Sequence, residues 1–91
     1  MTWTIKYLGS VKKQVKKIDP QARREIRNYL EQRVATLDNC RDIGQPLSAN
    51  LTGLWRYRVG DYRIICEIQN QEMIVLVVRI GHRKLVYKKP L

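Results

Sequence analysis

The chain has 91 residues, 44% of them hydrophobic, which is enough for one small globular domain with a modest core. Its 18 Lys and Arg residues against 8 Asp and Glu residues give a formal net charge of +10, so the expected partner is a nucleic acid, an acidic protein or an anionic membrane. A membrane fits least, because no apolar run approaches the roughly 20 residues of a spanning helix and the N-terminus lacks a long apolar signal region, so a cytoplasmic location is expected.

The first expected elements are a strand and a short basic helix. Apolar and polar residues alternate over residues 3–7, which is the period of a half-buried strand. Ser10 follows Gly9 and is expected to cap a helix whose apolar residues recur at helical spacing from Val11 to Ile18. The outer face of this helix carries four lysines, which either rest on an RNA backbone or form a solvated surface: Lys12, Lys13, Lys16 and Lys17.

A second helix is expected to begin at Asp19 and Pro20, because an Asp cap followed by Pro in the first turn is a strong helix start. Its apolar stripe should pack against a sheet and consists of Ile26, Leu30, Val34 and Leu37. Residues 39–50 contain Asp, Gly, Pro and Ser and are expected to form a loop. The two cysteines, Cys40 and Cys66, are expected to be reduced thiols.

Residues 54–68 predict a β-hairpin that closes at Gly60-Asp61, a pair that suits a type II′ turn. This turn places Arg58 opposite Arg63 and Arg56 opposite Ile65, so that three arginines share one face. The other face is apolar and pairs Val59 with Tyr62, Tyr57 with Ile64, and Trp55 with Cys66. Like charges directly opposite one another destabilise a sheet, so we expect this arginine cluster to bind an anion.

A continuous apolar run over residues 73–78 predicts a last strand that is buried on both faces and that ends over residues 79–84. We find no internal repeat and no sign of a second domain, so residues 1–91 are expected to form a single domain. The order strand, helix, helix and three strands predicts an α+β fold. Two N-terminal helices would pack on one face of a mainly antiparallel four-stranded sheet.

The sequence lacks the motifs of several enzyme classes: a P-loop, a GxGxxG motif, paired carboxylates and a Ser/His/Asp set. On composition alone, the lone histidine, His82, is expected to be a surface residue. What remains is a set of cations, Arg56, Arg58, Arg63 and Arg83, which could grip a phosphodiester and stabilise the charge of a phosphorane transition state. Tyr87 could stack on a base or donate a hydrogen bond.

Three segments carry a resemblance to the RelE toxins of the RelE/ParE superfamily. They are residues 54–65 (LWRYRVGDYRII), residues 78–83 (VRIGHR) and Val86-Tyr87, and the likeness extends over essentially the whole chain. The resemblance implies a microbial ribonuclease-like fold and a toxin that cleaves mRNA in the ribosomal A site. It also implies an acidic, RelB-like antitoxin as a partner, and no metal or cofactor.

The resemblance also implies roles for the matching residues. Arg56, Arg58, Arg63, Arg83 and Tyr87 would orient the mRNA, activate its 2′-hydroxyl and protonate the leaving 5′-oxygen. Further RNA contacts are expected from the four lysines of the first helix and from Lys84 and Lys88.

One departure from the family concerns the general base. The best-known member has lysines at the positions of Arg56 and Arg58, and an arginine is a poor proton acceptor. Imidazole is the side chain best suited to acid–base chemistry near neutral pH, so His82 is a candidate catalyst. Two other functions stay open: a ParE-like toxin that inhibits DNA gyrase without cutting RNA, and a catalytically weak RNA-binding relative.

Overall fold

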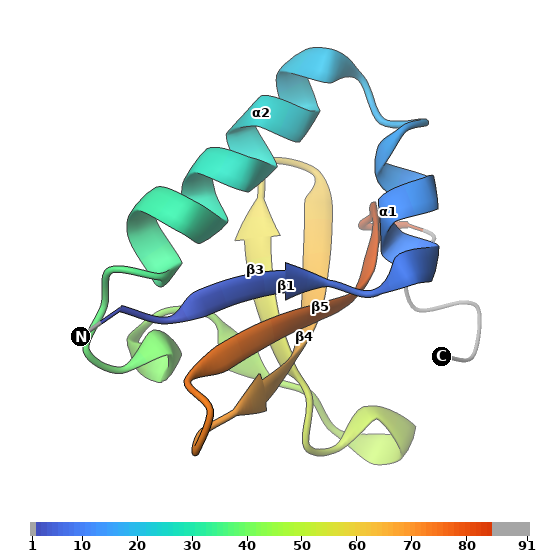
Figure 1. Ribbon diagram of the computed structural model, residues 1–91. Coiled ribbons are helices and arrows are strands. Elements are labelled where there is room, and N and C mark those ends of the chain that lie inside the picture. Colours follow the sequence, from blue (N-terminus) through green and yellow to red (C-terminus); the bar gives the residue numbers. More distant parts are fainter. Residues whose placement is uncertain (1, 85–91) are drawn as a thin grey trace.

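Five strands form one mixed sheet in the computed structural model, which describes residues 2–84 (Figure 1). Across the sheet they lie in the order β1-β5-β4-β3-β2. Neighbouring strands are antiparallel except β1, which runs parallel to β5. The predicted α+β fold is confirmed, although the sheet has five strands rather than four. Their bounds are Thr4–Tyr7 (β1), Gln45–Pro46 (β2), Trp55–Val59 (β3), Tyr62–Gln69 (β4) and Ile74–His82 (β5).

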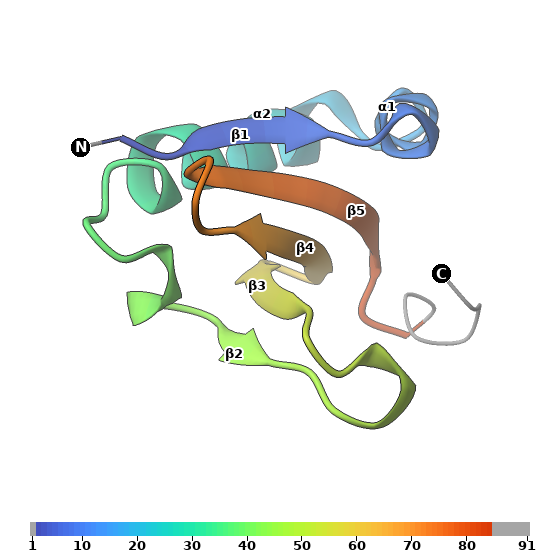
Figure 2. The same cartoon turned by 60° about the horizontal axis from the view of Figure 1, so that its bottom comes forward.

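The helices lie together on one side of this sheet, as predicted (Figure 2). Helix α1 spans Gly9–Val15, and helix α2 spans Pro20–Asn28 and continues into a π-helical segment, η1, at Tyr29–Val34. Two 3₁₀ turns follow, η2 at Cys40–Asp42 and η3 at Ala49–Leu51. Within residues 2–84, no helix has the length and apolar character needed to cross a membrane.

The start of α2 is the one predicted from the sequence, and the start of α1 is not. The carboxylate of Asp19 accepts hydrogen bonds from the amides of Gln21 and Ala22, at 3.1 and 3.2 Å. The prediction that Ser10 caps α1 is wrong, because this helix begins at Gly9 and Leu8 takes the cap position. The amides of Val11 and Lys12 both donate to the carbonyl of Leu8, so Ser10 lies inside the first turn.

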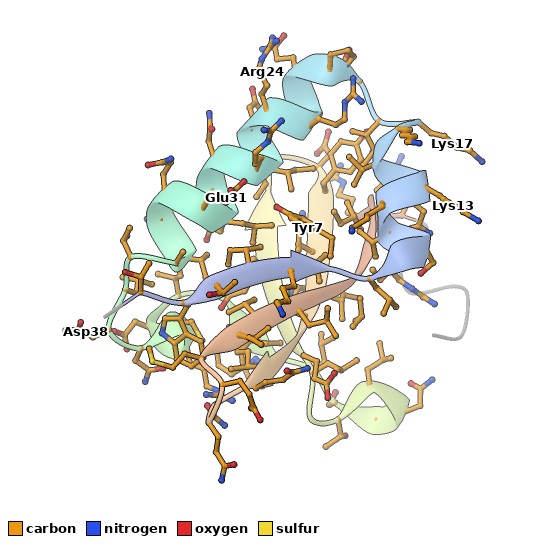
Figure 3. The ribbon with its side chains drawn as sticks, viewed as in Figure 1. Tyr7, Lys13, Lys17, Arg24, Glu31 and Asp38 are labelled. Carbon is orange, nitrogen blue, oxygen red and sulfur yellow. The ribbon has the colours of Figure 1, made fainter. Side chains whose placement is uncertain are left out.

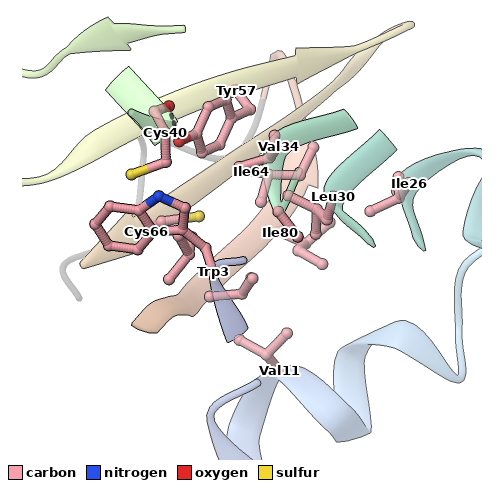
Figure 4. Close-up of a cluster of buried hydrophobic side chains, with 13 residues drawn as sticks. Trp3, Val11, Ile26, Leu30, Val34, Cys40, Tyr57, Ile64, Cys66 and Ile80 are labelled. Carbon is pink, nitrogen blue, oxygen red and sulfur yellow. Dashed lines mark hydrogen bonds between the residues drawn. The ribbon is translucent and has the colours of Figure 1, made fainter. Parts of the chain in front are cut away.

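The core lies between the helices and the sheet (Figure 4). Both layers contribute fully buried side chains, and the predicted stripe of the second helix supplies Ile26, Leu30 and Val34. The hydroxyl of Tyr57 is also buried there and donates to the carbonyl of Cys40 at 2.6 Å. Burial raises the pKa of Tyr57 above its ordinary value, so this donor stays protonated.

The β3–β4 hairpin has the predicted register at each of its pairs, including Arg58 opposite Arg63 and Arg56 opposite Ile65. Gly60 has a φ of +58°, while Asp61 does not enter the left-handed region. A positive φ at the first turn position alone is the requirement of a type II′ turn. The predicted separation of an apolar face from an arginine face is therefore confirmed.

Strand β5 contains a bulge that the sequence did not reveal. Cys66 pairs with Val77, but the preceding residue of β4, Ile65, pairs with Arg79, so Val78 is an extra residue. Plain alternation from Val75 and Val77 would point Arg79 into the core. The bulge reverses the alternation, which buries Ile80 and sends Arg79 to the other face.

Residues 39–50 are more ordered than the predicted loop. The segment contains η2, the two-residue strand β2 and the start of η3. The indole of Trp55 donates to the carbonyl of Ile43 at 2.9 Å and fixes the approach to β2. Gly44 then passes close to β3 with a φ of +85°. A Cβ at Gly44 would lie 2.5 Å from both the carbonyl oxygen of Arg56 and the indole nitrogen of Trp55.

Replacing Gly44 by alanine should lower the free energy of unfolding more than replacing Gly53. Both glycines have a positive φ, but a Cβ at Gly53 would meet nothing within 4 Å. Gly53→Ala should therefore cost about 1–2 kcal/mol, the strain of a left-handed residue. Gly44→Ala adds a clash with backbone and should cost clearly more. Urea unfolding followed by tryptophan fluorescence measures both, and equal losses would contradict the close approach.

Candidate functional site

Four arginines project from the side of the sheet that faces away from the helices. Arg58 pairs with Arg63, and Arg56 and Arg79 flank Ile65 from the two neighbouring strands. Because successive residues of a strand alternate between faces, these pairs place all four side chains on one face. We call this surface, made of Arg56, Arg58, Arg63 and Arg79, the arginine face.

Arg63 is the buried member of the arginine face, with 8% of its surface exposed. Its guanidinium donates to the carbonyls of Gly60 and Tyr62, both at 3.1 Å. The turn thus orients Arg63 and partly offsets its charge, while Arg58 across the ladder stays exposed. Directly opposed side chains have Cβ atoms roughly 4.5–5.5 Å apart, so the two cations lie close enough to bind one phosphate.

Arg79 is a member of the arginine face that sequence reasoning missed. Arg79 lies on this face because of the bulge in β5, and the continuous apolar run before Arg79 does not indicate that bulge. Glu67 was also passed over, although it alternates with Arg63 and Ile65 along β4. Among the described residues of β3, β4 and β5, Glu67 is the one carboxylate on this face.

Side chains at the border of the arginine face hold two of the predicted site residues. Gln45 of β2 accepts a hydrogen bond from the guanidinium of Arg56 at 2.7 Å. The backbone amide of Arg83 donates to the carbonyl of Asp61 at 2.8 Å, and its guanidinium lies 3.8 Å from the Asp61 carboxylate. Arg83 is thereby tied to the same turn that orients Arg63.

His82 is not brought together with the arginine face. It pairs with Tyr62, whose side chain belongs to the apolar side of the hairpin, and the two rings meet edge to face at 6.2 Å. Its Nδ1 accepts a hydrogen bond from the amide of Lys84 at 3.3 Å. A direct proton transfer from RNA held on the arginine face to His82 therefore has no support from this geometry.

The lysines of α1 also lie away from the arginine face. Figure 3 shows Lys13 of α1 and Lys17, in the turn after this helix, extending away from the body of the protein. Lys12 instead borders a groove on the helix side. Two predicted site residues, Tyr87 and Lys88, lie outside the residues that the structure describes.

The groove on the helix side has a volume of about 660 Å³ and lies between α1, α2 and the sheet. Its floor is apolar, and its rim is basic. Burial, together with the nearby negative charge of Glu31, raises the pKa of Tyr7 in this groove to about 12. The surface thus fits a segment with apolar and acidic side chains. The floor of the groove includes Tyr7, Ile18 and Ile26, and its rim includes Lys12, Arg23, Arg24 and Arg27.

The arginine face can bind polyanions and stabilise added negative charge, because guanidinium groups stay protonated and match phosphate oxygens. Arginines cannot accept a proton at neutral pH, so Glu67 is the proton acceptor that the described part of this face offers. Within residues 2–84, no group of three or more His, Cys, Asp or Glu side chains is placed to hold a metal ion.

Comparison with known proteins gives consistent matches over nearly the whole chain. The family model described as "ParE toxin of type II toxin-antitoxin system, parDE" matches residues 5–87. Toxin RelG of Mycobacterium tuberculosis is 24% identical over 92 residues, which cover 98% of this chain and 100% of RelG.

Solved structures share the fold at lower sequence identity. The toxin in the M. tuberculosis toxin–antitoxin complex RelBE2 has a TM-score of 0.82 at 20% identity, with 91% of this chain and 93% of that chain covered. A free E. coli RelE mutant has a TM-score of 0.73 at 14% identity, with 92% of this chain and 86% of that chain covered.

Removing Arg79 should weaken binding of single-stranded polyanions as much as removing Arg58. Each phosphate contact contributes about 0.7 to the slope of log affinity against log salt, so Arg79→Ala should make the slope shallower by about that amount. Arg24→Ala is the matched control, because it removes the same charge from the helix side. Fluorescence anisotropy with labelled polyuridylate at several salt concentrations measures the slopes, and equal changes for Arg79 and Arg24 would argue against a localised site.

Proposed function

The chain belongs to the ParE toxin family of type II toxin–antitoxin systems, within the RelE/ParE superfamily, and on that premise we propose that it is an endoribonuclease that cleaves mRNA in the ribosomal A site. The main support for this proposal is the arginine face, with Arg83 held at its border by the contact with Asp61. Four guanidiniums gathered on one surface make it strongly positive, and guanidinium groups match the charge and geometry of phosphate oxygens. An RNA backbone supplies such phosphates at regular spacing.

In the proposed reaction, the 2′-oxygen of one nucleotide attacks the adjacent phosphorus and the bond to the 5′-oxygen of the next nucleotide breaks. The products are a 2′,3′-cyclic phosphate and a 5′-hydroxyl. Arg63 and Arg79 would stabilise the charge that gathers on the phosphoryl oxygens in the transition state, while Arg56 and Arg58 hold the flanking backbone. Through the family resemblance, Arg83 and Tyr87 would act with these arginines in orienting the mRNA and in protonating the leaving 5′-oxygen.

Proton removal from the 2′-hydroxyl is the step for which the arginine face has the fewest candidates. Arg56 and Arg58 are poor acceptors, and His82 pairs on the other face. We assign most of the rate to positioning and to charge stabilisation, with Glu67 as the carboxylate to test for a base. A missing base typically costs a factor of about 10²–10⁴, so the enzyme should be slower than relatives that have one.

Inhibition of DNA gyrase is the second candidate function, and the match to the ParE toxin model favours it. A gyrase inhibitor has no need for four arginines aligned on one sheet face, and this weighs toward the nuclease. Inducing the protein in cells, mapping new mRNA 5′ ends and following plasmid supercoiling separates the two. New ends with normal supercoiling support the nuclease, and altered supercoiling with intact mRNA supports the gyrase inhibitor.

A cognate antitoxin is the expected protein partner of a type II toxin, and relatives of known structure include toxin–antitoxin complexes. With 18 basic against 8 acidic residues in the toxin, we propose that the antitoxin is acidic where it binds. The arginine face is one docking surface. The groove on the helix side, with its apolar floor and basic rim, is a second.

Arg83→Ala should abolish toxicity and leave the fold intact. Its ion pair with Asp61 is exposed on both sides, and such pairs contribute at most about 1 kcal/mol. Growth after induction measures toxicity, and thermal unfolding checks the fold. Arg27→Ala, which removes the exposed ion pair between Arg27 of α2 and Glu31 of η1, is the matched control and should stay toxic. If Arg83→Ala arrests growth like the parent protein, Arg83 has no catalytic role.

A single deoxyribose on the 5′ side of the scissile phosphate should stop cleavage without reducing binding, because it removes only the nucleophile. Programmed ribosomes carrying either the all-ribose message or the singly substituted message provide the comparison. Primer extension measures cleavage, and toxin retention on the ribosome measures binding. Equal cleavage of the two messages would rule out attack by the 2′-hydroxyl.

A further inference from the structure

We propose that a small pocket at the open edge of β3 takes one unpaired base of the RNA strand, and this inference rests on the proposed RNA binding. The pocket has a volume of about 230 Å³ and is lined by Tyr29, Gly44, Gln45, Arg56 and Arg58. Pockets for whole drug-sized ligands measure roughly 300–1,000 Å³, so this one suits a single ring system. Two of its lining residues belong to the arginine face, so a base inside it would be continuous with a bound backbone.

The pocket exists because β2 is too short to cover the edge of β3. Strand β2 pairs only with Trp55 and Arg56, whereas β3 continues to Val59. Among residues 2–84, no strand pairs with the edge of β3 beside Arg58, and Tyr29 in the first turn of η1 lines the pocket there.

One wall of the pocket is held in place by side chains of β3. The hydroxyl of Tyr57 donates to the carbonyl of Cys40, and the indole of Trp55 donates to that of Ile43. Gly44 lies so close to β3 that no Cβ fits between them. The wall that carries Gln45 is thus preformed, and a ligand need not order it on binding.

The ring of Tyr29 supplies an aromatic surface in the pocket. It is half-buried, and it packs at a tilt against Tyr57 with centroids 6.1 Å apart. The Arg33 guanidinium lies 5.5 Å from its centroid. Burial raises the pKa of Tyr29, so its phenol is neutral at physiological pH. Unpaired RNA bases stack on such rings with little dependence on sequence.

Gln45 adds a means of choosing between bases. Its amide oxygen already accepts from Arg56, so its amide nitrogen is the group left to meet a ligand. A donor at this position favours bases that present an acceptor, such as O6 of guanine or O4 of uracil. Stacking on Tyr29 would hold the base, Gln45 would select it, and Arg58 would hold a neighbouring phosphate.

The test uses a series of short 2′-fluoro RNAs, each with an abasic site at a different position. These RNAs have no 2′-hydroxyl that could attack the phosphate, so they can be bound without being cleaved. Dissociation constants are measured for each abasic position with the parent protein and with Tyr29→Leu, Tyr29→Phe and Gln45→Ala. With the parent, one position should cost about 5- to 150-fold in affinity, the range of one base–aromatic stack. Tyr29→Phe should keep that penalty and Tyr29→Leu should lose it.

Gln45→Ala provides a second readout in case Tyr29→Leu unfolds, since Gln45 is exposed. Gln45→Ala should reduce the preference for one base at the same position and leave the affinity for the abasic RNA unchanged. Two results would overturn the pocket and leave the proposed function intact. One is an abasic penalty that is the same in Tyr29→Leu and in the parent. The other is no abasic penalty at any position while Arg58→Ala still weakens binding. Absence of any RNA binding by the parent would overturn the pocket, whereas the proposed function is decided separately by cleavage on programmed ribosomes. Loss of antitoxin binding alone in Tyr29→Leu would reassign the pocket to the protein partner.

Discussion

The pairing of β3 with β4 determines which side of the sheet becomes core and which becomes binding surface. Side chains of a strand alternate with a period of two, so a slip of one residue exchanges the faces completely. Such a slip of β3 against β4 would place Arg63 on the same face as Tyr57, or Arg58 on the same face as Ile64, and so mix arginines with side chains that are now fully buried. The turn at Gly60 prevents it, because the two-residue loop fixes the pairs that follow. The helices, the core and the arginine face all depend on this register.

Local chemistry made much of this fold predictable. The cap at Asp19 and the turn at Gly60 each depend on neighbouring residues, and both were correctly predicted. The strand β2 was not predicted, because its two residues carry no strand pattern and are held by the distant Trp55. Arg79 was missed because a bulge is a property of two paired strands, whereas a pattern is read along one. The side of the sheet that His82 occupies depends on the same pairing.

The arginine face lowers the stability of the fold, and hydrogen bonds from neighbouring residues offset part of this loss. Arg63 is almost buried beside another cation, and burial of a charge is unfavourable unless hydrogen bonds replace the lost water. The carbonyls of Gly60 and Tyr62 accept from it and so supply part of this replacement. The same two contacts fix the direction of the guanidinium before any ligand arrives. Stability and preorganisation of the site therefore depend on one set of bonds.

The parallel pairing of β1 with β5 has a consequence for the newly made chain. Thr4 of β1 lies beside Ile74 of β5, so β1 cannot form this pairing until β5, far along the chain, has been synthesised. Contacts between such distant segments slow folding and form late. The arginine face likewise combines β3, β4 and β5, and it is complete only when β5 joins the sheet. A chain still being translated thus lacks the surface with which it would act on RNA, and a truncated product would lack it permanently.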